Sequence, residues 1–456
     1  MLFSSLEFLY LFLPIAVAFY FLAPRRARNL VLLIESLAFY AWGEISLLWV
    51  MLLVILLNFV GGLLIERVRA RRTVLCVTVA LNIAVLAFFK YTDFFLENLG
   101  FSPLGIVLPL GISFYIFQAM SYVCDVYRGV SAQKSLVSFG AYVTMFPQLV
   151  AGPIVRYTEV DEALRSRSAR LSDIADGIRV FSVGLAKKVL LANNAGKIRE
   201  IFLSAGEGYI TVVGEWAALI LFAFQIYFDF GGYSDMAVGL GKIFGFSFPK
   251  NFDYPYVSRS ITEFWRRWHI TLSSWFREYV YITLGGNRCS RARMYFNLFV
   301  VWTLTGLWHG AEWCFTLWGI YFFLLLVLEK AFLLGALEKL PQIVGRIYAL
   351  FFIMIGWFIF TCEEPAEFLH FGRLFGLGVD GFINGFVIYE LSRFLPLIII
   401  MAVGSTPTLT RFFCKAENKL PRVVSALRAI LPPVAILLST AALAGESYNP
   451  FLYFRF

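Results

Sequence analysis

Charged residues are scarce in this chain of 456 residues. They make up 15% of it, whereas a soluble domain carries about 25%. Hydrophobic residues account for 60%, and Phe alone occurs 49 times. A soluble core needs far less apolar surface, so the composition excludes an ordinary soluble enzyme. It predicts a polytopic membrane protein built from apolar helices.

Histidine and cysteine are also rare. The chain has three histidines and six cysteines. The cysteines are far apart, form no CxxC pair and lie mostly in apolar runs, as small buried hydrophobic residues do. We therefore expect neither a disulfide framework nor a metal site, and no permanently bound cofactor.

The net charge of +9 comes from basic residues that cluster between hydrophobic runs. Basic loops follow the first, third and fifth runs, namely Arg25–Arg28, Arg67–Arg72, and Arg128 with Lys134, whereas residues 90–105 are not basic. This alternation places those loops in the cytoplasm and the N-terminus outside, in a multi-pass protein of the cell inner membrane. The expected partner of the basic loops is membrane lipid rather than nucleic acid.

Apolar runs predict about a dozen membrane segments within one domain, residues 1–456. Several runs are shorter than the roughly 20 residues of a perpendicular span, so we expect tilted, re-entrant or interfacial segments among them. The runs lie near residues 6–22, 30–43, 47–65, 74–89, 106–123, 136–151, 211–230, 294–308, 314–334, 343–361, 383–403 and 430–445.

Two stretches depart from a simple span. Met145–Tyr157 carries Pro147 and Gly152-Pro153 inside an apolar run, which predicts broken backbone beside a cavity, with a kinked helix as the alternative. Leu171–Leu191 mixes apolar residues with acids and bases and predicts an amphipathic helix at the membrane surface.

Polar groups at membrane depth are costly and usually line a pathway or a site. A first group lies in Phe224–Tyr256, where Gly231-Gly232 is expected to break a helix. The structural alternative is that the acids here only bridge or cap helices. The candidates for substrate or donor binding in this group are Gln225, Asp229, Ser234, Asp235 and Asn251.

A second group lies in "TEFWRRWHITLSSWFREYVYITLGGN", residues 262–287. Apolar residues from Ile261 to Tyr279 recur every three or four positions, which predicts one helix at the membrane surface with His269 on its inward face. The arginines suit either lipid headgroups or the phosphates of a donor. The candidates for donor binding here are Trp265, Arg266, Arg267, Trp268 and Arg277.

A third group is "LTGLWHGAEWCFTLWGIYFF", residues 304–323, which contains Trp308, His309 and Glu312. A buried histidine is often only a satisfied core residue, but at membrane depth a functional role gains weight. A neutral imidazole can accept a proton, and Glu312, about one turn further, is a candidate to orient the ring.

Residues 262–287, followed by "LTGLWHG" at 304–310, resemble the membrane-bound O-acyltransferase family. The resemblance covers nearly the whole chain. Within the family, the chain is similar in particular to the branch that acetylates bacterial polysaccharides such as alginate and peptidoglycan. The teichoic acid D-alanyl transfer protein is a relative of that branch. The resemblance includes "LFLP" (11–14), residues 108–129, "FPQLVAGPIVRY" (146–157), "YFDFGGYSDMAVGLG" (227–241) and "PFLYFRF" (450–456).

The resemblance implies an all-α bundle of roughly a dozen helices around a central tunnel or funnel, with a catalytic core at about residues 105–335. It implies His309 as the catalytic residue and His269 as a supporting one, but it assigns no role to Glu312. It also implies acetyl-CoA as a cytoplasmic donor. The acyl group would pass to an extracytoplasmic partner, an SGNH-type acetyltransferase, or to a polysaccharide hydroxyl.

Three alternatives stay open at this point. A member of the same family could acylate a lipid or a protein instead. In a transporter or proton-coupled carrier, Asp229, Asp235, His309 and Glu312 would form a pathway, although no internal repeat supports this. A mere scaffold gains nothing from a buried His309.

Overall fold

The computed structural model describes residues 2–150, 152–206, 208–445, 448–450 and 452. Helices form almost all of its regular structure, and the β pairing within these residues is one isolated bridge between Thr211 and Gly381. The chain is therefore an all-α protein, as the sequence predicts. Its contacts group it into two compact units, residues 1–182 with 233–250, and residues 183–232 with 251–456. The expectation of a single domain stays a prediction.

Seven helices in the described part of the chain are long and apolar enough to cross a membrane. They confirm a multi-pass membrane protein and match seven of the predicted runs. They are Leu48–Arg67 (α3), Arg71–Asn98 (α4), Val212–Ile243 (α11), Trp313–Leu337 (α15 and its continuation), Gln342–Thr361 (α17), Gly385–Gly404 (α18) and Pro421–Gly445 (α20).

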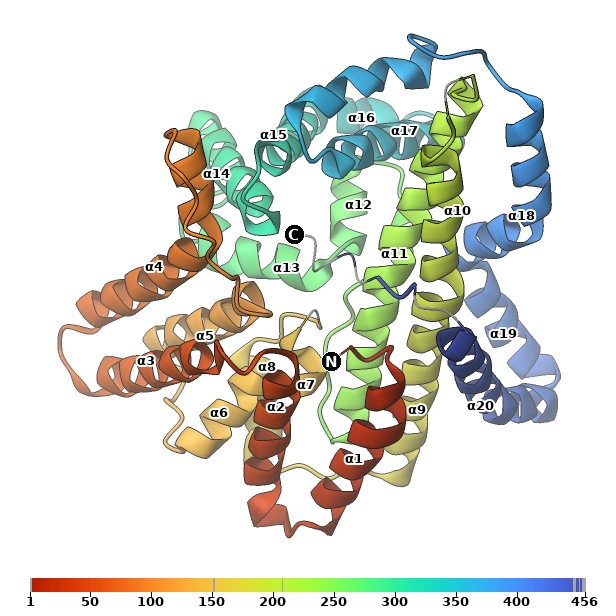
Figure 1. The fold of residues 1–456 in the computed structure, drawn as a ribbon. Coiled ribbons are helices and arrows are strands. Elements are labelled where there is room, and N and C mark those ends of the chain that lie inside the picture. Colours follow the sequence, from red (N-terminus) through yellow and green to blue (C-terminus); the bar gives the residue numbers. More distant parts are fainter. Residues whose placement is uncertain (1, 151, 207, 446–447, 451, 453–456) are drawn as a thin grey trace. The chain divides into compact units, whose positions relative to one another are not determined.

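The first unit contains the N-terminal helices, which are red to yellow in Figure 1. Asn58 on α3 and Asn82 on α4 are fully buried and exchange side-chain hydrogen bonds of 2.9 and 3.0 Å, which fixes the register of these two spans. Its other helices are Leu13–Leu22 (α1), Arg28–Glu44 (α2), Ile112–Tyr127 (α5), Leu136–Thr144 (α6), Phe146–Leu149 (α7), Tyr157–Arg165 (α8) and most of Leu171–Ala186 (α9).

Two predicted features of this region can be compared with the structure. Met145–Tyr157 is indeed broken, because α6, α7 and α8 are separate helices here; Ala151 lies outside the described residues. The predicted cavity beside it stays a prediction. The predicted helix at 171–191 extends as α9 through a π-helical turn at Lys187–Ala192 into Asn193–Leu203 (α10). The prediction of a helix at the membrane surface is wrong at Lys188, because this residue is only 1% exposed.

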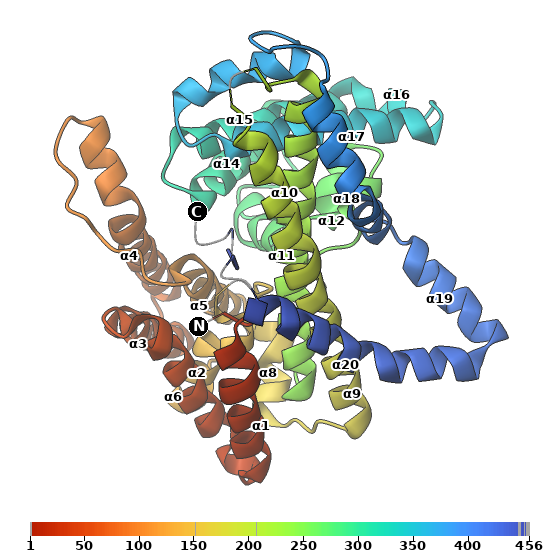
Figure 2. The same cartoon turned by 45° about the vertical axis from the view of Figure 1, so that its right-hand side comes forward.

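The second unit contains the remaining helices. In both views α10 runs beside α11, and α19 and α20 form a hairpin (Figures 1 and 2). The elements that complete it are Ile261–Arg267 (α12), Ile270–Trp275 (α13), Arg291–His309 (α14), Trp313–Leu328 (α15), Leu334–Leu337 (α16), a 3₁₀ segment at Pro365–Phe375, and Thr408–Lys419 (α19).

The glycine pair in α11 does not break the helix, contrary to the prediction. A Cβ at Gly232 would lie 2.7 Å from the Gly184 carbonyl oxygen and 2.9 Å from the Lys188 nitrogen. Gly232 therefore lets α11 approach the end of α9 closely, as small residues do between membrane helices, and α11 continues to Ile243.

Candidate active site

The end of α14 places His309. Ser290 caps the start of this helix by accepting a hydrogen bond from the Arg293 backbone N–H, and the helix ends at His309, before an extended Gly310. Neighbouring α15 packs against α14 at two glycines. A Cβ at Gly306 would lie 2.4 Å from the Phe315 carbonyl oxygen, and one at Gly319 would lie 2.3 Å from the Trp302 carbonyl oxygen. Only glycine permits this approach.

Aromatic rings surround the half-buried His309. Its ring centroid lies 5.0 Å from that of Trp308, 5.1 Å from Trp318 and 5.3 Å from Phe360, each with the rings nearly perpendicular. Edge-to-face contacts of this kind fix a ring in position. His309 is therefore held in a defined orientation by residues of α14, α15 and α17.

His269 lies in a sharp turn between α12 and α13. Its φ of 46° and ψ of 51° are left-handed, a conformation that costs a non-glycine residue free energy. Ser260 caps α12, and the carboxylate of buried Glu329 accepts hydrogen bonds from the backbone N–H groups of Ile261 (2.6 Å) and Thr262 (2.8 Å). The prediction of one continuous helix from Ile261 to Tyr279 was therefore wrong.

The inward orientation predicted for His269 is confirmed, because the residue is 4% exposed. Its ring contacts Trp308, with 5.9 Å between centroids, so Trp308 contacts both imidazoles. His269 Nδ1 is buried and has no hydrogen-bond partner within the described residues. His269 lies outside the seven long apolar helices, and burial lowers its pKa to about 3, so the ring is neutral at physiological pH.

Both histidines line one cavity of about 270 Å³. Predicted residues Trp265, Arg266, Trp268 and Arg277 also line it, and both arginines are exposed at its edge. The described lining includes no aspartate or glutamate. The cavity thus combines an apolar interior with positive charge. Its remaining lining residues are Thr262, Leu272, Ser273, Phe276, Tyr281, Leu298, Val301, Trp302, Thr305 and Leu326.

Other predicted residues lie outside this lining. Arg267 binds Glu263 (2.9 Å) and Asp253 (3.3 Å), and Asn251 accepts hydrogen bonds from Thr271. Ser234 and Asp235 belong to the first unit. Donor-binding roles for these residues stay predictions.

Gln225 and Asp229 face α10 and the C-terminal segment. Asp229 forms an ion pair of 2.8 Å with Lys188, and both side chains are at most 2% exposed. Asp229 also accepts a hydrogen bond from the Leu452 backbone N–H, while Lys188 binds the Pro450 carbonyl. These bonds join α11 to other segments, which is what we expect if the acids of this region only bridge helices.

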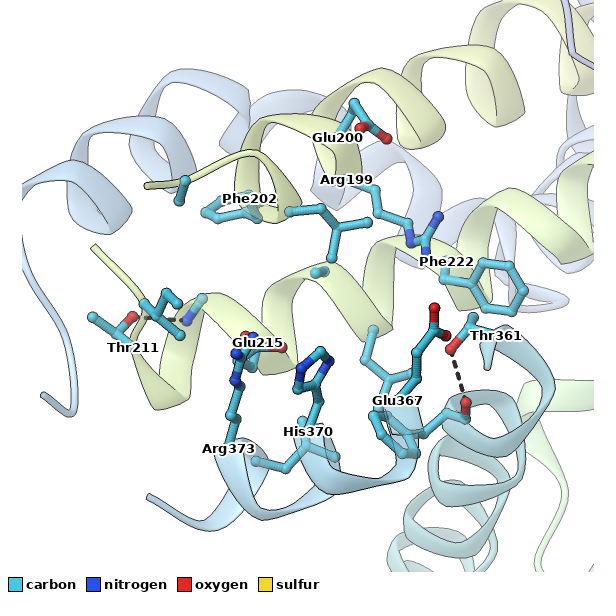
Figure 3. Close-up of a pocket in the computed structure, with 18 of the residues that line it drawn as sticks. Arg199, Glu200, Phe202, Thr211, Glu215, Phe222, Thr361, Glu367, His370 and Arg373 are labelled. Carbon is cyan, nitrogen blue, oxygen red and sulfur yellow. Dashed lines mark hydrogen bonds and ion pairs between the residues drawn. The ribbon is translucent and has the colours of Figure 1, made fainter. Parts of the chain in front are cut away.

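Two further cavities lie in the second unit, and Phe360 lines one of them. Glu312 lines one of about 420 Å³ together with Phe315 and Phe360. A second, of about 390 Å³, is shown in Figure 3, where Glu215, His370 and Arg373 lie side by side. The two cavities share Phe222, Thr361, Cys362 and Glu363.

None of the site residues predicted from the sequence lines the cavity of Figure 3. Its lining carries four glutamates, two arginines and the third histidine of the chain. The sequence signal for this cavity was His370, which lies shortly after a membrane span and is followed by Arg373. These charged residues are Arg199, Glu200, Glu215, Glu363, Glu367, His370 and Arg373. The described residues include no group of three or more His, Cys, Asp or Glu that could hold a metal.

The chain is thus a helical membrane protein with two histidines on one cavity. The profile of the membrane-bound O-acyltransferase family matches residues 36–364, and the chain belongs to this family. It is accordingly an O-acyltransferase.

The relatives are enzymes of polysaccharide modification. The chain is 36% identical to "Probable alginate O-acetylase AlgI" of Azotobacter vinelandii, over 100% of both chains. It is 33% identical to "Peptidoglycan O-acetyltransferase" of Helicobacter pylori, over 86% of this chain and 82% of that protein. It is 30% identical to "Teichoic acid D-alanyltransferase" of Streptococcus thermophilus, over 49% of this chain and 57% of that protein.

Proposed function

We propose that this protein transfers an acetyl group from cytoplasmic acetyl-CoA to a hydroxyl group outside the membrane, for O-acetylation of a cell-surface or secreted polysaccharide. The observation that carries the proposal is the position of His269 and His309 on the lining of one cavity, both in contact with Trp308. The names of the relatives support acetyl as the group and a polysaccharide as the final acceptor.

His309 acts as the general base. It takes the proton of the acceptor hydroxyl while the hydroxyl oxygen attacks the thioester carbonyl carbon. A C–O bond forms, the C–S bond breaks, and the proton passes from His309 to the leaving thiolate. Neutral His269 carries one N–H group, which donates a hydrogen bond to the oxyanion formed on the way.

Positive charge at the cavity of both histidines supports binding of the donor there. Arg266 and Arg277 lie at its edge, and guanidinium groups bind phosphates well. The lining between these arginines and His309 is largely apolar and suits the uncharged arm of a thioester. Exclusion of water there protects the thioester from hydrolysis.

The acceptor reaches His309 through the cavities of Figure 3 and of Glu312, whereas the donor binds in the cavity of both histidines. The cavity of Figure 3 and the cavity that Glu312 lines share lining residues. The cavity of Glu312 also reaches Phe360, whose ring contacts His309. Four glutamates there repel phosphate groups but accept hydrogen bonds from hydroxyl groups. The acceptor is a hydroxyl of an SGNH-type partner that passes the acetyl group to the polysaccharide, or a hydroxyl of the polysaccharide itself.

The proposed location is the cell inner membrane, with the N-terminus outside. The basic loops at Arg25–Arg28 and Arg67–Arg72 support this orientation, since positive loops remain in the cytoplasm. A cytoplasmic donor and an extracytoplasmic acceptor then meet at His309.

The test is His309→Ala, compared with Arg293→Ala, an exposed residue outside the lining of all three cavities, as the control. We expect His309→Ala to remain folded in the membrane but to lose acetylation of the polysaccharide in cells and release of free thiol from acetyl-CoA in membranes. Arg293→Ala should retain thiol release. Full activity of His309→Ala would overturn the assignment. Solute transport without thiol release would favour the carrier alternative, and acetylated lipid or protein alone would favour the alternative acceptors.

A further inference from the structure

His269 needs an external restraint, because its left-handed backbone is disfavoured for any residue with a Cβ. Helix α13 supplies part of that restraint, because the His269 carbonyl accepts a hydrogen bond from the Ser273 backbone N–H at 3.0 Å. The rest comes from a segment that precedes both helices, Asn251–Asp253, which we call the clamp segment.

Hydrogen bonds join the clamp segment to both sides of His269. Before the histidine, the Asp253 backbone N–H donates to the Arg267 carbonyl at 2.9 Å, and Arg267 Nη1 donates to the Asp253 carbonyl at 3.1 Å. After the histidine, the Ile270 backbone N–H donates to the Asn251 carbonyl at 2.9 Å. The turn is therefore paired with the clamp segment along its length.

The Asn251 side chain completes the pairing. Its Oδ1 accepts the Thr271 backbone N–H at 3.1 Å and the Thr271 hydroxyl at 2.9 Å. Asn251 and Thr271 are 4% and 5% exposed, so water does not substitute for these bonds. One oxygen thereby caps the start of α13, directly after the strained histidine.

The middle residue of the clamp segment contacts the imidazole itself. The Phe252 ring lies 6.1 Å from the His269 ring and 5.0 Å from that of Trp268, centroid to centroid. Trp308 contacts the His269 ring as well, at 5.9 Å. Backbone and ring of His269 are thus both held by the clamp segment, whose residues do not line the cavity.

We propose that Asn251 is a positioning residue of the transfer reaction, which acts by holding His269 toward the reacting carbonyl. The inference rests on the proposed function, because it requires that His269 donates a hydrogen bond to the oxyanion. Arg267 shares the positioning role on the other side of the turn. Both residues thereby act through His269 instead of binding the donor.

The test compares Asn251→Ala with Asn251→Asp, which retains the accepting oxygen. We expect kcat of Asn251→Ala to fall by about 10- to 100-fold, as misplaced catalytic groups do, with KM for acetyl-CoA within about 2-fold of wild type. Asn251→Asp should recover kcat to within about 5-fold of wild type. Thr271→Val should show a smaller loss than Asn251→Ala, and Thr271→Ser little loss.

The control variant is Asn297→Ala. Asn297 is also fully buried in the second unit and holds a turn by donating to the Leu284 and Gly286 carbonyls, but it lies outside the cavity lining. Its kcat, per folded protein, should equal that of wild type. If Asn251→Ala and Asn297→Ala lose kcat alike, the positioning role is overturned in favour of a structural one.

A second measurement does not depend on turnover. Diethyl pyrocarbonate modifies neutral imidazoles, and peptide mass spectrometry resolves the three histidines. We expect His269 to react faster in Asn251→Ala than in wild type, while exposed His370 reacts at the same rate in both. Unchanged reactivity of His269 contradicts the clamp even if His309→Ala is inactive. An active His309→Ala would instead overturn the proposed function and leave this measurement standing.

Discussion

At the residue scale, His269 and His309 reach the same cavity through different backbone conformations. His309 ends a regular helix, whereas His269 occupies a left-handed turn and is completely buried. A substitution at 269 therefore tests two properties together, the imidazole and the tolerance for positive φ. Asparagine and aspartate are enriched in this conformation among residues with a Cβ, so His269→Asn removes the ring with little disturbance of the turn.

The first prediction concerns stability and pH. Burial lowers the pKa of His269 to about 3, against about 6.5 for a free imidazole, so between these values the unfolded chain binds a proton that the folded chain does not. The contribution is complete above pH 6.5 and decreases as pH falls. We expect wild type to lose about 2 kcal/mol from this group between pH 6.5 and 5.

Thermal unfolding in detergent at pH 7.5 and at pH 5 checks this prediction. His269→Asn should show a smaller drop in melting temperature between the two conditions than wild type does. His370→Asn serves as the control and should retain the wild-type drop. An equal drop in wild type and His269→Asn would mean that the imidazole is protonated in the folded protein.

At the element scale, close contacts between segments decide where the two histidines lie. The sequence predicted the seven long spans, an apolar run that ends near residue 308 and six of the residues on the cavity of both histidines. It failed at Gly231-Gly232 and at Trp268–His269. Both failures have the same physical origin, because contacts with distant segments, Gly184–Lys188 and Asn251–Asp253, override the local pattern. Periodicity cannot reveal such contacts.

The second prediction concerns the contact between α14 and α15. Gly319→Ala places a Cβ 2.3 Å from the Trp302 carbonyl oxygen, so the two helices must separate and His309 must move. We expect a loss of about 1–3 kcal/mol in stability, as for overpacked cores, and a fall in transfer activity. Gly335→Ala on α16 is the matched control, since nothing lies within 4 Å of its Cβ. Wild-type melting and activity in Gly319→Ala would contradict this packing.

The third prediction concerns the buried ion pair between Lys188 and Asp229. Removal of one partner leaves an unpaired buried charge, so Asp229→Leu alone should lose about 3–5 kcal/mol of stability. Replacement of both, Lys188→Met with Asp229→Leu, should restore folding and most thiol release from acetyl-CoA. A folded but inactive double variant would instead place the pair in the donor site or in a proton pathway. Melting temperature and thiol release measured together separate these outcomes.

At the scale of the whole molecule, charge is divided between the cavities of the second unit. Arginines without acids border the cavity of both histidines, whereas four glutamates and two arginines line the cavity of Figure 3. The proposed phosphate-bearing donor and the proposed hydroxyl-bearing acceptor would then be attracted to different cavities. The net charge of +9 is thus less informative about substrates than the distribution of the charges.

The fourth prediction tests this division through Arg266 and Arg277. Both are exposed, so each contributes modestly, and the double variant to Gln should raise KM for acetyl-CoA by about 3- to 10-fold at low salt. The effect should shrink at high salt and disappear with acetyl-pantetheine, which lacks the nucleotide phosphates. Arg293→Gln, an exposed arginine outside the cavity lining, should leave KM unchanged. If the double variant alters only the dependence of activity on anionic lipid, the two arginines bind headgroups and the donor phosphates lie elsewhere.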